Sequence, residues 1–324
     1  MNGLSDTERL VVDHLQEGFP LVARPFEAAG RALGLDESRL ITTLQALLSR
    51  RVLTRFGPLV QVERLGGAFV LAALSVPEPR YEAVAVQVNA LPAVAHNYRR
   101  EHALNMWFVL ATEQPEGIGE AIATIERHTA LPVYAFPKER EYFVGMRFTV
   151  GGTAPVGQGR HRPLAQPCPL ETADRALVRA VQAGLPLVPA PYAEVARLTG
   201  LEESIVLARL SRLLDSGVFR RIGAVPNHYA IGYTANGMAV FDVEDGAVDR
   251  LGEALGAMPA VSHCYRRPRR LPLWPYNLFA MLHGDSREAV CAEVARLRTG
   301  MGEACRDHAV LFSSRILKKT GLRI

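Results

Sequence analysis

The sequence predicts an α+β fold built as a tandem duplication, in which each copy places three short helices and a β wing before a βαββαβ domain. The first observation is an internal repeat: Gly34–Ser38 is matched by Gly200–Ser204, and Arg55 is matched by Arg221 at the same offset. The second is a repeated motif, because His96–Arg100 is matched by His263–Arg267 with the offset one residue longer. The third is that helical and strand-like periodicities follow one another in the same order in both copies.

Each copy opens with a predicted winged helix-turn-helix. In copy one, helical patterns cover residues 6–17, 23–33 and 36–50. The third helix has apolar residues at helical spacing in both copies, namely Leu40, Leu44, Leu47 and Leu48 in copy one and Val206, Leu210, Leu213 and Leu214 in copy two. A glycine then ends the helix in copy two, and Arg220–Gly223 begins a β wing.

A ferredoxin-like domain follows in each copy. Copy one has strand-like segments at 68–76, 94–102, 104–112 and 133–144, with helical segments at 81–91 and 115–129. Copy two repeats this order from 233–243 to 308–320. The predicted domains are therefore winged helices at 1–60 and 170–226, ferredoxin-like domains at 61–150 and 227–324, and a linker rich in Gly and Pro at 151–169.

Composition narrows the function classes. The chain has 324 residues, of which 48% are hydrophobic and 22% charged, as in an ordinary globular protein. It has no apolar run of membrane-spanning length and no basic, apolar leader, so we expect a cytoplasmic protein. None of its four cysteines forms a C-x-x-C pair, which argues against zinc-ribbon and iron–sulfur sites. The formal net charge of +4 suits nucleic acid or a polyanionic small molecule.

The second strand of each ferredoxin-like domain carries the candidate catalytic residues. Because alternate side chains of a strand share a face, His96, Tyr98 and Arg100 should point the same way. The same holds for the repeated set, His263, Tyr265 and Arg267. A proton donor beside a fixed cation suits chemistry on a carboxylate. Arg99 and Arg266 are further candidates, as additional cations of the same strands.

Other residues are candidates for binding a substrate. Asn105 and Asn277 align on the following strand, where Trp107 would add an aromatic wall. Further cations are available from Arg55, Arg220, Arg221, Lys318 and Lys319. The histidines outside the repeated motif are expected at the surface or in core packing, among them His102, His283 and His308.

The motifs resemble those of a known family. His96–His102 followed by Asn105–Phe108 looks like one subunit type of the sirohaem decarboxylases, and His263–Pro268 followed by Trp274–Leu278 looks like the other. The resemblance implies removal of CO₂ from two acetate side chains of sirohaem, giving didecarboxysirohaem for haem d1 or for the alternative haem route. It implies no cofactor beyond the iron of the substrate, and no residue is assigned as an axial iron ligand.

The resemblance also bears on partners and roles. Because the family pairs unlike subunits and this chain holds both types, it implies an internal pseudo-dimer; a homodimer of the whole chain is compatible with the same pattern. The implied pathway partners are downstream enzymes of haem d1 biosynthesis. We hypothesise that His96 or His263 delivers a proton, that Tyr98 or Tyr265 orients it, and that a neighbouring arginine holds the carboxylate.

Two alternatives come from other classes. A winged helix followed by a ferredoxin-like domain also resembles the leucine-responsive and asparagine-type (Lrp/AsnC) transcription regulators, which would place helix 36–50 or 203–216 in a DNA major groove. Those helices carry few basic residues, and two unlike copies fit a palindromic operator poorly, so nucleic acid is not the expected partner. A haem-binding protein without chemistry is the other alternative, and turnover distinguishes it from the enzyme.

Overall fold

The computed structural model describes residues 3–145, 148, 150 and 169–319, and these form two compact units. One unit contains both winged helices, with residues up to Leu65 and the stretch that ends at Gly232. The other contains both ferredoxin-like domains, from Gly66 and again from Tyr233. The expected linker lies outside the described residues, apart from Pro169.

The first unit contains the three predicted helices of each copy. Copy one has α1 (Asp6–Leu15), α2 (Pro25–Leu33) and α3 (Glu37–Ser49), and copy two has α6 (Thr172–Val181), α7 (Pro191–Thr199) and α8 (Glu203–Asp215). Ser5 and Glu8 form a capping box at the start of α1. Gly34 and Gly200 end α2 and α7 in the left-handed conformation, with φ of 68° and 69°. These local signals explain why the helix positions are readable from sequence.

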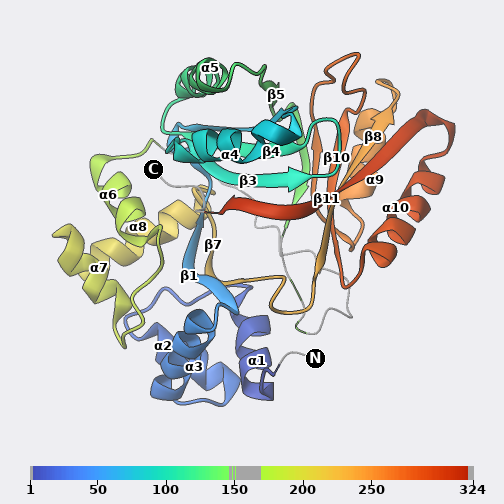
Figure 1. Ribbon diagram of the computed structural model, residues 1–324. Coiled ribbons are helices and arrows are strands. Elements are labelled where there is room, and N and C mark those ends of the chain that lie inside the picture. The colour runs from blue at the N-terminus through green and yellow to red at the C-terminus, as the bar shows by residue number, and fades with distance from the viewer. Residues whose placement is uncertain (1–2, 146–147, 149, 151–168, 320–324) are drawn as a thin grey trace. The chain divides into compact units, whose positions relative to one another are not determined.

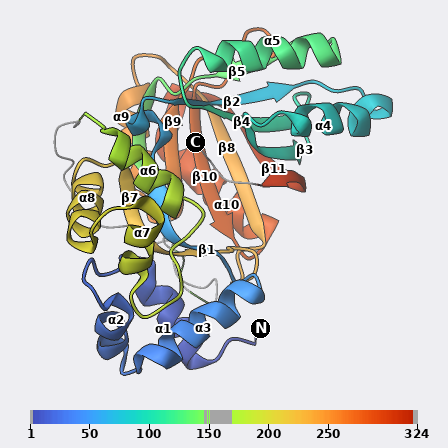
Figure 2. The same cartoon turned by 90° about the vertical axis from the view of Figure 1, so that its left-hand side faces the viewer.

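The wings of the two copies pair with each other. Strands β1 (Leu53–Val60) and β7 (Phe219–Pro226) run antiparallel, and Gly57 lies opposite Gly223. The helices of copy one, in blue, and those of copy two, in yellow-green, gather around this ribbon (Figure 2). A Cβ at Gly223 would lie 2.2 Å from the carbonyl oxygen of Leu15, so the close approach of wing and helix requires glycine there.

The second unit is built on a nine-stranded sheet with the order β5-β2-β4-β3-β11-β8-β10-β9-β6. Copy one contributes β2 (Ala68–Leu74), β3 (Val94–Arg100), β4 (Met106–Thr112), β5 (Tyr134–Phe136) and β6 (Arg140–Val144). Copy two contributes β8 (Ala235–Val243), β9 (Val261–Arg266), β10 (Leu278–Gly284) and β11 (Cys305–Lys319). The four-strand sets β5-β2-β4-β3 and β11-β8-β10-β9 have the same order, which confirms the predicted duplicated ferredoxin-like fold.

Two helices cover one face of each four-strand set. In copy one they are α4 (Tyr81–Ala90) and α5 (Gly117–Thr129), and in copy two α9 (Val248–Gly256) and α10 (Arg287–Met301) (Figure 1). Each helix pair closes its own apolar core. The opposite faces of the two sets share a third core, in which the ring centroids of Trp107 and Trp274 are 4.9 Å apart. The helix-free face of each sheet is therefore the one that meets the other copy.

The last strand of copy one differs from the prediction. The segment expected as one strand at 133–144 forms two, because Pro137 lacks the N–H that a continuous ladder needs. The first, β5, pairs with β2 of its own copy, whereas β6 crosses to pair with β9. In copy two, β11 stays continuous: Cys305–Phe312 pairs with β8, and Ser313–Lys319 pairs with β3. Figure 1 shows β11 in red, running from β8 to β3.

Candidate functional site

The predicted alternation of side chains is seen in both copies. On β3 the ring centroids of His96 and Tyr98 are 6.2 Å apart, and the Arg100 guanidinium carbon lies 5.8 Å from the Tyr98 ring. On β9 the corresponding distances are 6.2 Å for His263 and Tyr265 and 4.8 Å for Arg267 and Tyr265. We call these sets row one (His96, Tyr98, Arg100) and row two (His263, Tyr265, Arg267). Each row combines a proton-transfer group, a phenol and a cation on one face.

The arginine of each row is anchored to the other copy. Arg100 is buried and donates from Nη1 to the carbonyl oxygen of Leu311 on β11. Arg267 is buried as well and donates from Nη1 to the carbonyl oxygen of Phe136 on β5, at 2.5 Å. A guanidinium fixed in this way presents its charge without having to reorganise during a reaction. Because each arginine bonds to a carbonyl oxygen of the other copy, the two rows are held in place in the same way.

Arg99 and Arg266 lie on the opposite face of the sheet. Arg99 makes a salt bridge with Glu78 at 2.8 Å and lies over the ring of Tyr81. Arg266 pairs with Glu139 at 3.0 Å on the side of its sheet that α9 covers. Period-two alternation requires this, since the residue next to Arg100 or Arg267 must point away from the row. The structure therefore does not bring Arg99 and Arg266 together with the histidines.

The two candidate lysines also lie on opposite faces of the sheet. Lys319 lies opposite His96 in the β11–β3 ladder, and Lys318 lies opposite Asn97. Lys318 donates from Nζ to the carbonyl oxygens of Asn89 and Leu91, at 2.7 and 3.0 Å, at the end of α4. Only Lys319 therefore shares the face of row one.

The surroundings of the two rows differ in charge. In copy two, Val144 lies opposite His263, and Glu141 lies opposite Tyr265. The cation beside His96 thus has an apolar counterpart beside His263. Row two instead has Glu141 nearby, whose carboxylate pairs with Lys138 at 3.0 Å.

Three further candidates have their polar groups engaged by the protein itself. Asn105 exchanges hydrogen bonds with the backbone of Val76, at 2.9 and 2.8 Å. Asn277 makes the equivalent pair of bonds to Val243, at 2.9 Å each. Trp107 is buried in the shared core and donates from Nε1 to the carbonyl oxygen of Leu104 at 2.7 Å. Their arrangement serves to position strands and fill the core.

The arginines of the wings belong to the winged-helix unit. Arg55 donates from Nη1 to the carbonyl oxygen of Gln182 at 2.6 Å, and Arg221 makes the reciprocal contact with Gln16. Each contact joins the wing of one copy to the end of the first helix of the other. Burial first, and the nearby Arg55 second, lower the pKa of Arg221 to about 10. Arg220 is exposed on the same strand.

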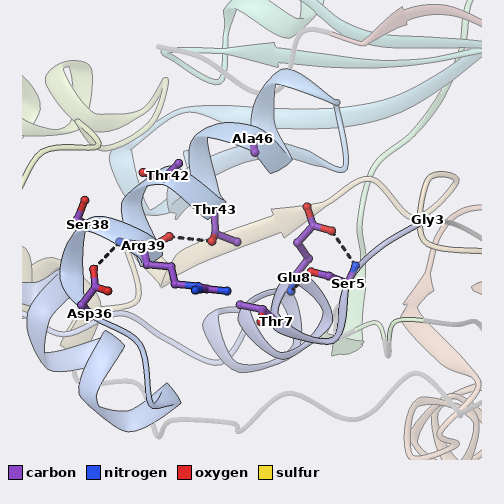
Figure 3. A pocket seen from close by; sticks show the side chains of 10 residues that line it. All are labelled: Gly3, Ser5, Thr7, Glu8, Asp36, Ser38, Arg39, Thr42, Thr43 and Ala46. Atoms are coloured by element: carbon purple, nitrogen blue, oxygen red, sulfur yellow. Dashed lines mark hydrogen bonds between the residues drawn. The ribbon is translucent and has the colours of Figure 1, made fainter.

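A pocket on the winged helix of copy one offers a different setting. It has a volume of about 730 Å³ and is lined by Gly3, Ser5, Thr7, Glu8, Asp36, Ser38, Arg39, Thr42, Thr43 and Ala46 (Figure 3). Its walls are mostly polar side chains of α1, α3 and the residues just before each helix, and the lining contains no aromatic ring. A flat apolar macrocycle needs aromatic or aliphatic walls, so this pocket is not our candidate site.

Sequence reasoning missed three residues of copy two. The hydroxyl of Ser262 lies 2.9 Å from Nδ1 of His263 and 2.7 Å from Nε2 of His283, which the sequence assigned to the surface or the core. Nδ1 of His283 in turn contacts Oδ1 of Asn236. The signal in the sequence was weak: a serine directly before the motif histidine, and two polar residues facing each other across β8 and β10.

The acid–base behaviour of His96 follows from its burial. Burial first, and the charge of Lys319 second, lower its pKa from 6.5 to about 4. Between these values the unfolded chain takes up a proton at His96 that the folded chain does not, so the free energy of unfolding should fall as the pH drops through this window. We expect NMR titration to show His96 neutral down to about pH 4. Lys319→Met should raise its pKa only in part, because burial is the larger cause; a wild-type pKa near 6.5 would contradict this account.

Within the described ranges, no group of three or more His, Cys, Asp or Glu residues is placed to hold a metal ion. Among those same residues, no helix has both the length and the apolar character needed to cross a membrane.

Comparison with known proteins fixes the family. A profile described as the AsnC-like ligand binding domain matches residues 64–142 and 230–318. A second, described as the Siroheme decarboxylase NirDL-like HTH domain, matches 8–53 and 174–220. The Siroheme decarboxylase NirDL subunit of Paracoccus denitrificans is 32% identical over 99% of this chain and 98% of the relative. The chain belongs to the sirohaem decarboxylase family.

Other members of the sirohaem decarboxylase family match in whole or in part. The crystal structure of the siroheme decarboxylase NirDL superposes with a TM-score of 0.74 at 28% identity, covering 98% of this chain and 94% of that one. NirDL in co-complex with an iron-uroporphyrin III analogue gives a TM-score of 0.73 at the same identity and coverage. The NirH subunit of Paracoccus pantotrophus is 56% identical over 47% of this chain and 94% of its own length. The NirG subunit of the same organism is 54% identical over 44% of this chain and 92% of its own length.

Proposed function

We propose that this chain is a carboxy-lyase that removes CO₂ from two acetate side chains of sirohaem and yields didecarboxysirohaem. The observation that carries the proposal is the pair of His-Tyr-Arg rows, each with its arginine anchored to the other copy. Family membership supports it, as does the iron-uroporphyrin analogue named with a solved relative. Sirohaem brings its own iron, so the proposal includes no further cofactor.

The rows suit the chemistry of decarboxylation. Loss of CO₂ from a ring-bound acetate leaves an electron pair on the methylene carbon, and one proton converts that carbon into a methyl group. In our proposal His96 or His263 delivers the proton, and Tyr98 or Tyr265 orients it. Arg100 and Arg267 hold carboxylates of the substrate, with Lys319 as an additional cation at row one.

The geometry reduces the number of residues that we propose for the reaction. Arg99, Arg266 and Lys318 lie on the helix-covered face. We therefore leave these three out, together with Asn105, Trp107 and Asn277, whose polar groups are already bonded within the protein. Arg55, Arg220 and Arg221 belong to the winged-helix unit, and we do not include them in the proposed set.

One contact argues against the regulator alternative. On α8, the helix that would enter a DNA groove, Arg209 pairs with Asp174 at 3.0 Å, and Arg212 pairs with the same carboxylate. Both arginines also pair with Glu171, at 2.8 Å for Arg209 and 3.7 Å for Arg212, so two carboxylates of the protein neutralise the two cations. A recognition helix needs such charges for phosphates and bases.

The deciding experiment is anaerobic incubation of the full chain with sirohaem, followed by mass spectrometry of the product. We expect the loss of two CO₂ units. A shifted Soret band without a change of mass would overturn the enzyme in favour of a haem-binding protein. The absence of any spectral response, together with salt-sensitive binding to DNA, would favour the regulator instead.

A further inference from the structure

A chain of hydrogen bonds runs behind the histidine of row two. The amide of Asn236 donates from Nδ2 to the carbonyl oxygen of Tyr233 at 3.3 Å, which turns its Oδ1 toward Nδ1 of His283. Nε2 of His283 lies 2.7 Å from the hydroxyl of Ser262, and that hydroxyl lies 2.9 Å from Nδ1 of His263. We call Asn236, His283 and Ser262 the supporting chain.

The direction of each hydrogen bond follows from the first one. Because Oδ1 of Asn236 can only accept, Nδ1 of His283 must carry a hydrogen. In neutral His283 the other nitrogen, Nε2, is then an acceptor, and Ser262 donates its only hydroxyl hydrogen to it. The oxygen of Ser262 is left to accept a hydrogen from Nδ1 of His263. The alternative acceptor for Ser262, the carbonyl oxygen of Met281, is more distant at 3.3 Å.

A β-bulge makes the contact with His263 geometrically possible. The β9–β10 register shifts between the pairs Leu282–Val261 and Met281–His263, so that Ser262 is the extra residue. Neighbouring side chains of a regular strand point to opposite faces, whereas the bulge lets Ser262 and His263 meet. The side chain of Ser262 is fully buried, which shields its hydrogen bonds from competing water.

Copy one has the same bulge but lacks the supporting chain. Ala95 occupies the bulge position there, before His96. In the strand pair that corresponds to Asn236 and His283, copy one places Phe69 opposite Ala111. Nδ1 of His96 is buried and meets no hydrogen-bond partner among the described residues. The two histidines therefore differ in what holds them, although their rows match.

We propose that Ser262, His283 and Asn236 are positioning residues that fix His263 as the Nδ1–H tautomer and thereby make row two the site of proton delivery. The inference rests on the proposed function, because it assigns a step of that reaction to one row. Nε2 of His263 is then the nitrogen that takes and gives up the catalytic proton. In row one Ala95 takes the place of Ser262, so His96 has no equivalent positioning group in the described part of the chain.

The proton balance of the step is simple. The bond between the methylene carbon and the carboxylate breaks, CO₂ leaves, and the electron pair stays on the carbon. Protonated His263 gives the hydrogen on Nε2 to this carbon, which becomes a methyl group. His263 returns to the neutral Nδ1–H form that Ser262 stabilises, and a proton from solvent recharges Nε2. No oxidant or reductant is needed.

The test compares Ser262→Ala with wild type in single-turnover reactions with sirohaem. We expect the rate of protonation to fall about 10- to 100-fold, a part of the general-acid contribution. The affinity for sirohaem, followed by the Soret band, should stay unchanged, and the pH profile of the rate should shift. Ser262→Thr keeps the hydroxyl and should restore most of the rate. Ser314→Ala, on an exposed part of β11, is the matched control.

A second measurement does not depend on turnover. ¹⁵N NMR of histidine-labelled protein should show the Nδ1–H tautomer of His263 in wild type and loss of that preference in Ser262→Ala. If Ser262→Ala does not fold, His283→Gln takes its place in both measurements, with His308→Gln as its control. An Nε2–H tautomer in wild type, or wild-type rates in both Ser262→Ala and His283→Gln, would overturn the supporting chain. If the wild-type protein does not decarboxylate sirohaem, the proposed function is wrong. The NMR measurement of the His263 tautomer still tests the supporting chain, because it needs no turnover.

Discussion

Replacing His263 by alanine should abolish at least one of the two decarboxylations, with a loss of rate of about 10²- to 10⁴-fold, the usual contribution of a general acid. The physical reason is that the methylene carbon left after CO₂ loss needs a proton from a positioned donor. His96→Ala, made separately, should also stop at least one decarboxylation, because it removes the histidine beside Tyr98 and Arg100 in the matching row. Mass spectrometry separates unreacted, singly and doubly decarboxylated products.

A third histidine provides the control for these two variants. His308→Ala removes a histidine that stacks on Phe241, away from both rows, and it should turn over like wild type. Titration of the Soret band with sirohaem should show that both motif variants still bind. Wild-type turnover in both His263→Ala and His96→Ala would rule out the proposed roles.

Trp107→Ala should lower the free energy of unfolding by about 3–5 kcal/mol, the range found when a large buried aromatic side chain is truncated. Trp107 is 1% exposed and packs on Phe136 and Trp274, with ring centroids 5.2 and 4.9 Å away. The cavity would open where the two ferredoxin-like domains share a core. Chemical denaturation of the full chain, followed by circular dichroism, measures the change.

This prediction separates a structural from a substrate-binding role for Trp107. Leu271→Ala is the control, since Leu271 is 71% exposed and its truncation should change stability little. If Trp107→Ala left stability unchanged while weakening the affinity for sirohaem, the residue would belong to the binding surface instead of the core.

Most of the fold could be predicted from local patterns. The capping residues Ser5 and Asp36, the left-handed glycines and the apolar periodicities each act within a few residues, and the helices begin and end near the predicted positions. The face shared by His96, Tyr98 and Arg100 was predictable for the same reason, since strand alternation is local. Because the chain is duplicated, the same reasoning predicts the corresponding face in the second copy.

Contacts between distant segments were not predictable in this way. The crossing of β6 to β9 depends on which sheet edge is open in the folded chain, and no residue of Arg140–Val144 encodes that choice by itself. Lys319 lies opposite His96 only because the end of β11 pairs with β3 of the other copy, which is again a contact between distant segments. The supporting chain needed a bulge at Ser262, and bulges have no clear signature in a single sequence.

The exchange of terminal strands has a consequence for assembly. An unpaired edge strand is a template for any other strand, including one from an identical molecule. In this chain β6 and the end of β11 cover the outer strands β9 and β3 of the opposite copy, so each half protects the other from unwanted association. Joining the halves covalently gives them an effective concentration in the millimolar range and a fixed one-to-one ratio. The NirH and NirG subunits match less than half of this chain over most of their own length, so this covalent link is absent from them.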